Sequence, residues 1–548
     1  MKSRLLYIPI LLLFSLSFVE CAKKGSPSGG ERDSIPPVIV RSVPENYTTN
    51  FKGNEISIYF DEYIKLKELQ KNLIISPPLE YPPNITPLST SKTLRIQIDD
   101  TLKENTTYSI NFGQSIVDNN EENPFEYYKY VFSTGSYIDS LTVNGRVQDA
   151  VLPNPEIPTT VMLYEANETY NDTLVYSEKP KYITTTKDST GIFEITNVKE
   201  GKYLLMALKE NNNDYTFQPG SDKIGVAENF ITLPSDSTYS LTLFKETPEY
   251  LIARPKYQAK NHILFGYEGI ADSLQVELLS EVPADFEYKT YRDLKKDTLH
   301  YWFKPEVEND SLLFLARNKD FTDTLTVRIK ELYKDSLNIS AINAGTVLPK
   351  DTLKLLVNTP FESFNTEKIT ILDNDSLNIE PRTAINKKYN IAQLFFPKTE
   401  GKTYQVQLLP GAITDFYEAT NDTLNYTLRT KVVSDYGTLN ITLENLKQFP
   451  VIIQLVDSKF KVIAEEYVTE LKPILFENIN PGRYYVRVIF DENENKKWDT
   501  GSFLNRQQPE RILYYPSQLE VRANWSLNET FILTENDPGP AETLDDPE

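Results

Sequence analysis

The sequence predicts an all-β protein, built as tandem antiparallel β-sandwiches in an elongated array. The chain has 548 residues with 34 Tyr and 27 Phe, and Val, Ile and Thr occur throughout. Such residues favour strands. Short runs such as residues 93–98 and 107–112 alternate between apolar and polar side chains, which is the period of a half-buried strand. Hydrophobic residues make up 40% of the chain, enough for packed cores, and its length predicts several domains.

The first predicted sandwich covers residues 34–136. Strands are expected at residues 55–60, 93–98, 107–112 and 127–134. Strands this short, at this spacing, are typical of an antiparallel sandwich. A single helical turn is expected between Asp61 and Leu73.

Several motifs of this segment follow one another in a recognisable order. They are Pro44-Glu45-Asn46, Ile58-Tyr59-Phe60-Asp61-Glu62, Thr107-Tyr108-Ser109-Ile110-Asn111-Phe112-Gly113 and Phe132-Ser133-Thr134-Gly135. The segment resembles the SbsA-type bacterial Ig-like domain. It particularly resembles lipoproteins of the Bacteroidetes group that carry this domain just after the lipid anchor.

Residues 137–247 follow a different pattern. The stretch from Gly191 to Ala207 reads as two strands joined by a Gly turn, with Phe193, Ile195 and Val198 facing inward and Gly201 in the turn. It is similar to the transthyretin-like or carboxypeptidase-regulatory-like β-sandwich, which implies that these two strands form a core hairpin.

The remaining sequence predicts a third unit with few recognisable motifs, followed by a repeat of the first two units. Residues 403–430 echo residues 107–134, and residues 475–486 echo residues 193–205. The expected units are a β-sandwich of unknown family at 248–342, an Ig-like domain at 343–432, a transthyretin-like sandwich at 433–534 and a disordered acidic tail at 535–548.

The first residues have the organisation of an export signal. Lys2 and Arg4 precede an apolar run at residues 5–19, which predicts a signal peptide at residues 1–20. Cys21, the one cysteine of the chain, follows, and residues 21–33 form a Gly/Ser/Pro-rich tether. The segment resembles a bacterial lipoprotein signal, which implies lipidation of Cys21, although Glu20 stands where a small residue is usual. The alternative is an ordinary signal peptide with an incidental thiol.

Composition and motifs exclude several classes of function. The formal net charge of -21 argues against nucleic-acid binding, because phosphate contacts need a basic face. The sequence contains two histidines, His262 and His300, and shows no zinc-protease, hydrolase or phosphate-loop motif. Adjacent carboxylates such as Asp61 and Glu62 would point to opposite faces of a strand. We therefore expect no catalytic residues and no enzyme.

One loop spaces oxygen donors as a calcium site would. Asp491, Asn493, Asn495 and Asp499 occupy positions 1, 3, 5 and 9 of the loop, and residues 211–214 with Asp222 occupy the same place in the earlier repeat. Against calcium, Lys496 and Lys497 bring positive charge. The alternative is an Asx-rich turn whose side chains bond local backbone amides, which we favour. No other cofactor is indicated.

An Asp followed by Ser or Thr and then Leu recurs along the chain. The pattern is that of a turn entering a strand, and it also resembles the O-glycosylation acceptor of exported Bacteroidetes proteins. The aspartates are Asp100, Asp139, Asp172, Asp272, Asp297, Asp310, Asp323, Asp335, Asp351, Asp375 and Asp422.

These features predict a non-catalytic, lipid-anchored cell-envelope protein. It would act as a multidomain scaffold or binding subunit for other envelope proteins, as an accessory component of an outer-membrane protein machine. The alternative is a glycan-binding surface lipoprotein, since the many Tyr could supply stacking platforms. We expect outer-membrane attachment, and Lys23 and Lys24 in place of an acidic run favour the periplasmic face over the cell surface.

Overall fold

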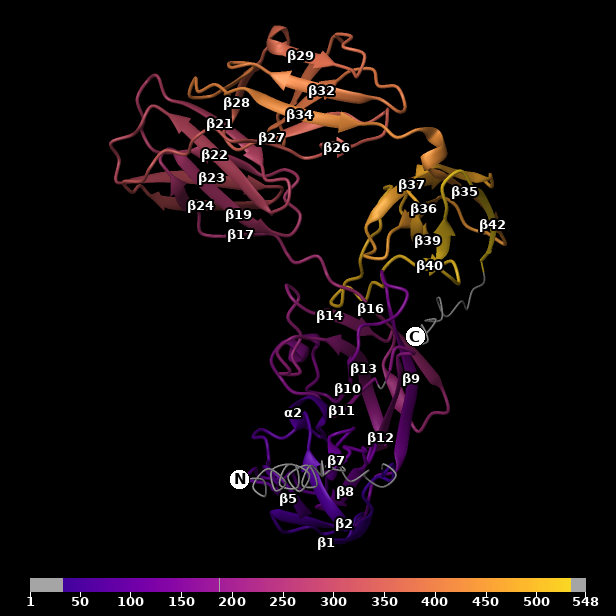
Figure 1. Ribbon diagram of the computed structural model, residues 1–548. Helices are drawn as coiled ribbons and strands as arrows, with labels where there is room; N and C mark the ends of the chain where they lie inside the picture. The colour runs from indigo at the N-terminus through magenta and orange to yellow at the C-terminus, as the bar shows by residue number, and fades with distance from the viewer. Residues whose placement is uncertain (1–32, 187, 534–548) are drawn as a thin grey trace, which may run out of the picture. The chain divides into compact units, whose positions relative to one another are not determined.

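The computed structural model describes residues 33–186 and 188–533, and it is an all-β protein of tandem β-sandwiches (Figure 1). The sheets are mostly antiparallel. In the described residues, three strand pairs run parallel. The chain divides into two compact units, one of residues up to 141 with 197–199 and one of the remaining residues.

The first unit is a two-sheet sandwich. Its core packs Ile58 of β2 and Ile96 of β5 against Ile110 of β6. The predicted alternation is confirmed at β5, where Leu94 and Ile96 are buried and Arg95 between them is exposed. One sheet contains β1 (Ile39–Val43), β2 (Glu55–Leu66), β5 (Ser91–Gln97) and β4 (Asn84–Thr86), with β7 (Ile116–Asp118) on β2; the other contains β3 (Ile74–Ser76), β6 (Thr107–Asn111) and β8 (Lys129–Ser133). The helix α2 (Leu69–Asn72) lies where one helical turn was expected.

The second sandwich opens the second unit. Its smaller sheet has the order β12 (Ile192–Val198), β9 (Leu141–Asp149), β16 (Thr238–Leu243). Its larger sheet has the order β11 (Tyr182–Thr185), β10 (Thr160–Glu165), β13 (Gly201–Lys209), β14 (Lys223–Val226), with β15 (Ile231–Leu233) also on β13. The 3-10 helix η2 (Asp172–Tyr176) follows β10.

The expected core hairpin of this sandwich is wrong. Strands β12 and β13 belong to opposite sheets, so the connection crosses the core instead of turning within one sheet. Near the end of β12, just before the connection, Asn197 has a left-handed backbone with φ 61, and Asn478 near the end of β38 repeats it with φ 57. Asn tolerates this conformation better than most residues. Gly201 has no positive φ; a Cβ there would approach the Tyr203 ring to 3.4 Å.

The third sandwich packs Phe265 of one sheet against Phe314 of the other, with ring centroids 5.2 Å apart. One sheet has the order β17 (Leu251–Ile252), β19 (His262–Glu268), β22 (Thr298–Lys304), β21 (Glu287–Arg292), with β18 (Lys256–Ala259) on β19. The other has the order β20 (Gln275–Leu278), β23 (Ser311–Asn318), β24 (Phe321–Arg328).

The fourth sandwich repeats the strand order of the first. The order β25 (Ile339–Ala341), β27 (Leu353–Val357), β31 (Ile391–Phe395), β30 (Arg382–Asn386) corresponds to β1-β2-β5-β4. The order β29 (Ile369–Leu372), β32 (Thr403–Leu408), β34 (Leu424–Arg429) corresponds to β3-β6-β8, with β26 (Gly345–Thr346) added beside β34. A further pair joins β28 (Phe361–Phe364) to β33 (Ile413–Asp415), and short 3-10 helices lie at η3 (Thr366–Lys368) and η4 (Val433–Asp435).

The fifth sandwich repeats the strand order of the second. Its smaller sheet is β38 (Ile474–Ile479), β35 (Gly437–Glu444), β42 (Ser526–Ile532), and β42 runs parallel to β35 as β16 does to β9. Its larger sheet is β37 (Val462–Val468), β36 (Val451–Val456), β39 (Gly482–Phe490), β40 (Ile512–Tyr514), with β41 (Leu519–Val521) on β39.

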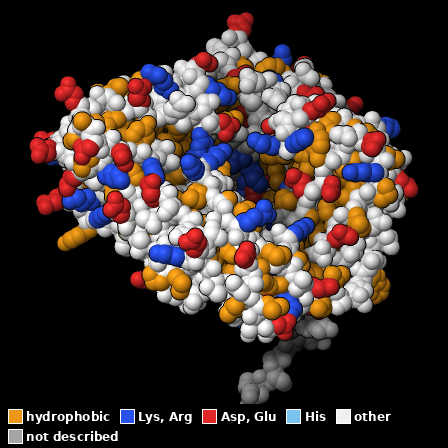
Figure 2. Space-filling view, turned by 90° about the horizontal axis from the view of Figure 1, so that it is seen from above, with side chains coloured by type: hydrophobic (Ala, Val, Ile, Leu, Met, Phe, Trp, Pro, Cys, Tyr) orange, Lys and Arg blue, Asp and Glu red, His pale blue; other side chains and the backbone are white. Residues whose placement is uncertain are grey.

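On the face shown in Figure 2, acidic side chains are spread over the surface, whereas many Lys and Arg side chains gather around its centre. Acidic side chains are scattered over its outer parts among hydrophobic and basic ones, and they form no single patch there. With a net charge of -21, such a distribution favours solubility over recognition of one cationic surface.

Candidate binding site

The second and fifth sandwiches are joined by the segment between β39 and β40. Phe503, from this segment of the fifth sandwich, is fully buried. Its ring makes edge contacts with Tyr176 and Phe217 of the second sandwich, at centroid distances of 6.3 and 6.4 Å. Gly501 passes so close that an added Cβ would lie 2.7 Å from the Phe244 ring. We call residues 500–508 the locking segment.

Polar contacts fix the same joint. Thr500 Oγ1 donates to the carbonyl of Lys245 at 2.7 Å, and Gln508 Nε2 donates to the carbonyl of Val226 at 3.1 Å. Arg506 forms an ion pair with Asp172. Bonds to backbone carbonyls that would otherwise be dehydrated and unpaired add orientation to the apolar contact.

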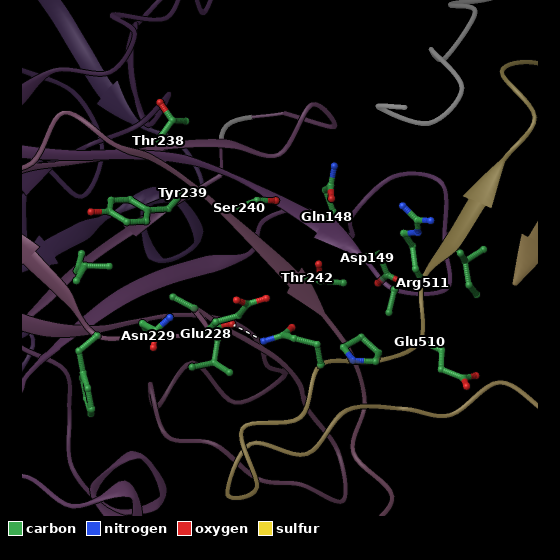
Figure 3. Close-up of a pocket in the computed structure, with 18 of the residues that line it drawn as sticks. Gln148, Asp149, Glu228, Asn229, Thr238, Tyr239, Ser240, Thr242, Glu510 and Arg511 are labelled. Carbon is green, nitrogen blue, oxygen red and sulfur yellow. Dashed lines mark hydrogen bonds between the residues drawn. The ribbon is translucent and has the colours of Figure 1, made fainter. Parts of the chain in front are cut away.

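Beside the locking segment lies a cleft of about 700 Å³, shown in Figure 3. Gln148 and Asp149 at the end of β9 contribute to its lining, together with side chains of β16 and of the loop before β15. The segment before β40 supplies Glu510 and Arg511. Polar and apolar surface contribute equally to the lining, which comes from two sandwiches, so the cleft exists only while the joint is closed.

Asp149, which lines the cleft, belongs to an ion-pair cluster with Lys223 and Glu156. Lys223 Nζ lies 2.8 Å from Asp149 Oδ2 and 2.9 Å from Glu156 Oε2. Burial lowers the pKa of Lys223, but these two carboxylates outweigh it and raise that pKa overall. Burial raises the pKa of Glu510, which accepts bonds from two backbone amides. Asp149 is thus held by an ion-pair partner.

The edge of β16 that does not pair with β9 borders the cleft, and just beyond the end of β16 Phe244 pairs with Ile224 of β14 on this same side. The carbonyl of Leu243 accepts from Ala150 N, so Leu243 turns its backbone toward β9. Because backbone groups alternate between the two sides of a strand, those of Thr238 and Ser240 point the other way. Both residues line the cleft, are exposed and are labelled in Figure 3. An edge of this kind is a template for a further strand.

The four candidate calcium ligands are brought together. Asn493 Nδ2 donates to Asp499 Oδ2, and Asn495 Nδ2 donates to the same oxygen at 2.6 Å. Both carboxylate oxygens of Asp491 accept local backbone bonds, from Asn495 N at 3.1 Å and Lys496 N at 2.9 Å. These bonds are those of an Asx-rich turn, and in the described residues no cluster of three His, Cys, Asp or Glu suits a metal.

The equivalent loop of the second sandwich has the same construction. Glu210 stands where Asp491 does and accepts from Asp214 N and Tyr215 N at 2.9 and 3.1 Å. Positive φ values recur at Asn213 and Tyr215, as they do at Glu494 and Lys496. Asp222 accepts from Gln218 N, as Glu510 accepts from Asp499 N. The shared role of these loops is to position the chain between two strands.

The two histidines meet in the third sandwich. His262 Nε2 and His300 Nδ1 are 3.0 Å apart, and the His262 ring stacks on Trp302 at 3.6 Å. Burial, and then the neighbouring His300, lower the pKa of His262 to about 3. Trp302 packs with Phe416 of the fourth sandwich. The histidine pair is therefore part of the packing between the third and fourth sandwiches. The positions of the two histidines along the chain gave no indication of this contact.

Cys21 and Glu20 lie outside the described residues. Among the residues that are described, no helix is long and apolar enough to cross a bilayer.

Comparisons with known proteins find a similarity to a known family for one domain of this chain. A search of curated proteins returns no match. Solved structures with matches include domains 1–6 of the surface layer protein SbsC, with 12% identity, coverage of 89% of this chain and 67% of that chain, and a TM-score of 0.15. They also include the Bacillus anthracis TIE protein, with 11% identity, 92% and 75% coverage, and a TM-score of 0.15.

A third match is SGBP-B of the Bacteroides ovatus mixed-linkage glucan utilization locus, in complex with a heptasaccharide. The identity is 10%, the coverage is 68% of this chain and 93% of that chain, and the TM-score is 0.17. TM-scores this low carry no argument about function. The family model described as bacterial Ig-like domain matches residues 33–134, so the first sandwich is similar to that family.

Proposed function

We propose that this protein is a non-catalytic, lipid-anchored protein of the Bacteroidetes cell envelope. It is attached to the outer membrane through Cys21, on the periplasmic face, and serves as a binding subunit of an outer-membrane protein machine. Two or more acyl chains, each methylene adding about 0.8 kcal/mol, hold such a protein at a bilayer.

The β16 edge is the observation that carries the binding role. A partner segment in extended conformation adds a strand beside Thr238 and Ser240, with backbone bonds supplying affinity. The cleft around this edge is about 700 Å³ in volume, and Glu510 and Arg511 of the fifth sandwich also line it (Figure 3). Side-chain contacts there give the partner segment its specificity.

The test is a capture experiment with the full-length tagged protein extracted from membranes. Ser240→Pro removes a backbone N–H that faces the cleft and is not used by β9, so the sheet tolerates it. We expect this variant to lose co-purifying envelope proteins. Asn528→Pro changes the equivalent edge of β42 and serves as the matched control. Recovery of the same partners with Ser240→Pro, or of no partner with the unmodified protein, contradicts the proposal.

Glycan binding is the second candidate function. The observation that favours it is Trp525, a large aromatic side chain that is 57% exposed beside a groove of the last sandwich. The capture experiment separates the two candidates, because glycan binding at this groove does not depend on Ser240.

A further inference from the structure

The last sandwich has an open groove at the edge formed by β41 and β42. Its volume is about 360 Å³, and both flanking strands and the turn before β41 contribute side chains. In the second sandwich, the corresponding edge between β15 and β16 contributes to the lining of the large cleft, where residues 508–512 of the fifth sandwich also lie. The groove of the last sandwich lies within that one sandwich, so it does not depend on the locking segment.

Trp525 lies at the start of β42 in this groove. Its side chain is 57% exposed, whereas Trp302 is fully buried and Trp498 donates its ring N–H to the carbonyl of Glu510 at 2.9 Å. The guanidinium of Arg522 lies 5.8 Å from the Trp525 ring centroid. An exposed indole leaves a large apolar area in water, which a ligand with an apolar face would cover.

The polar side chains around the indole are held in place. Arg522 makes two bonds with Glu520, at 2.9 and 3.2 Å. The Tyr515 hydroxyl donates to Glu529 Oε2 at 2.7 Å, and the Tyr515 ring packs against Phe531. The Tyr515 bond orients the carboxylate of Glu529, which lowers the cost of ordering that side chain on binding, whereas the Arg522–Glu520 pair is exposed to solvent.

We propose that this groove binds a neutral oligosaccharide. A pyranose ring presents C–H groups on one face, which stack on the indole of Trp525, and hydroxyl groups at its edge, which bond Gln518, Glu520 and Arg522. Glu520 and Glu529 disfavour an anionic ligand, and Arg522 is already paired with Glu520. The inference rests on the glycan-binding candidate and is independent of the partner segment at β16.

Tryptophan fluorescence of the full-length protein in detergent tests the proposal. The probes are neutral oligosaccharides of glucose, xylose, mannose and galactose, with oligogalacturonate as the anionic comparison. Since Trp525 is the exposed indole, we expect a blue shift and a saturable intensity change with at least one neutral probe. Both variants at Trp525 lack the reporting indole, so isothermal titration calorimetry measures their affinity. Trp525→Ala should weaken binding about tenfold or more, and Trp525→Phe should retain part of it, because stacking on an aromatic ring is lost only in the first variant.

Leu504→Ala, at an exposed site of the locking segment, is the matched control and should bind as the unmodified protein does. The proposal is overturned if no neutral probe binds at millimolar concentration, if oligogalacturonate alone binds, or if Trp525→Ala binds as tightly as the control. In each of these cases the capture experiment with Ser240→Pro still decides the partner proposal separately.

Discussion

Replacing Phe503 by Ala should open the joint between the second and fifth sandwiches without unfolding either. Phe503 is fully buried, yet it is not part of the core of its own sandwich. A buried aromatic side chain covers about 150–250 Å², which at about 25 cal/mol per Å² is an upper value of about 4–6 kcal/mol. Phe-to-Ala changes in cores cost about 3–5 kcal/mol. A loss of about 3 kcal/mol raises the open population roughly a hundredfold.

Trypsin cleavage after Arg506 measures this opening. In the closed joint, Arg506 is held by Asp172 and lies over the Phe503 ring, with its Cζ 4.9 Å from the centroid. Under conditions where opening is fast relative to cleavage, the rate follows the open population. We expect cleavage roughly a hundredfold faster in Phe503→Ala and unchanged in Leu504→Ala, whose side chain is 52% exposed. Equal rates in the two variants would refute the role given to Phe503.

Three further predictions follow from other contacts. Gly501→Ala should also accelerate cleavage after Arg506, because its Cβ would clash with the Phe244 ring; an unchanged rate would mean that the segment has room to move. Below the unfolded histidine pKa of about 6.5, the free energy of unfolding should fall by about 1.4 kcal/mol per pH unit for His262, which stays neutral when folded while the unfolded chain takes up a proton. Urea unfolding above and below that pH checks this, and a His262→Phe variant that keeps the full slope would contradict it. Millimolar calcium should leave the melting temperature unchanged, because Asp491 already bonds backbone amides, whereas Asp491→Ala should destabilise the loop by about 1–3 kcal/mol; a calcium-dependent rise in melting temperature would restore the metal interpretation.

Alternating strands were the most predictable feature of the fold. At β5 the buried residues are those expected, whereas in β6 the polar Thr107 and Ser109 are buried together with Tyr108 and Ile110. Alternation did not predict which sheet the strand after β12 joins. Phe193 and Ile195 would be buried whether β13 pairs with β12 in one sheet or lies in the opposite sheet. The sequence feature that could have indicated the crossing to the opposite sheet is an Asn at the same point of both repeats. These residues, Asn197 and Asn478, adopt positive φ.

The candidate site was less predictable because it depends on contacts between distant segments. The Asx-rich residues after β39 could be found by spacing, since they lie within one loop. The locking segment could have been noticed from Phe503 and Leu504, two apolar residues in an otherwise polar insertion. Its partners Tyr176 and Phe217 lie about three hundred residues earlier, and no sequence pattern pairs them.

Lipid anchoring through Cys21 is tested by the mass of the protein extracted from membranes. We expect a chain that begins at Cys21 and carries acyl chains on that residue, and a Cys21→Ser variant that is no longer found in the membrane fraction. A chain that begins at another residue with an unmodified thiol, or a Cys21→Ser variant that remains in the membrane fraction, would contradict it.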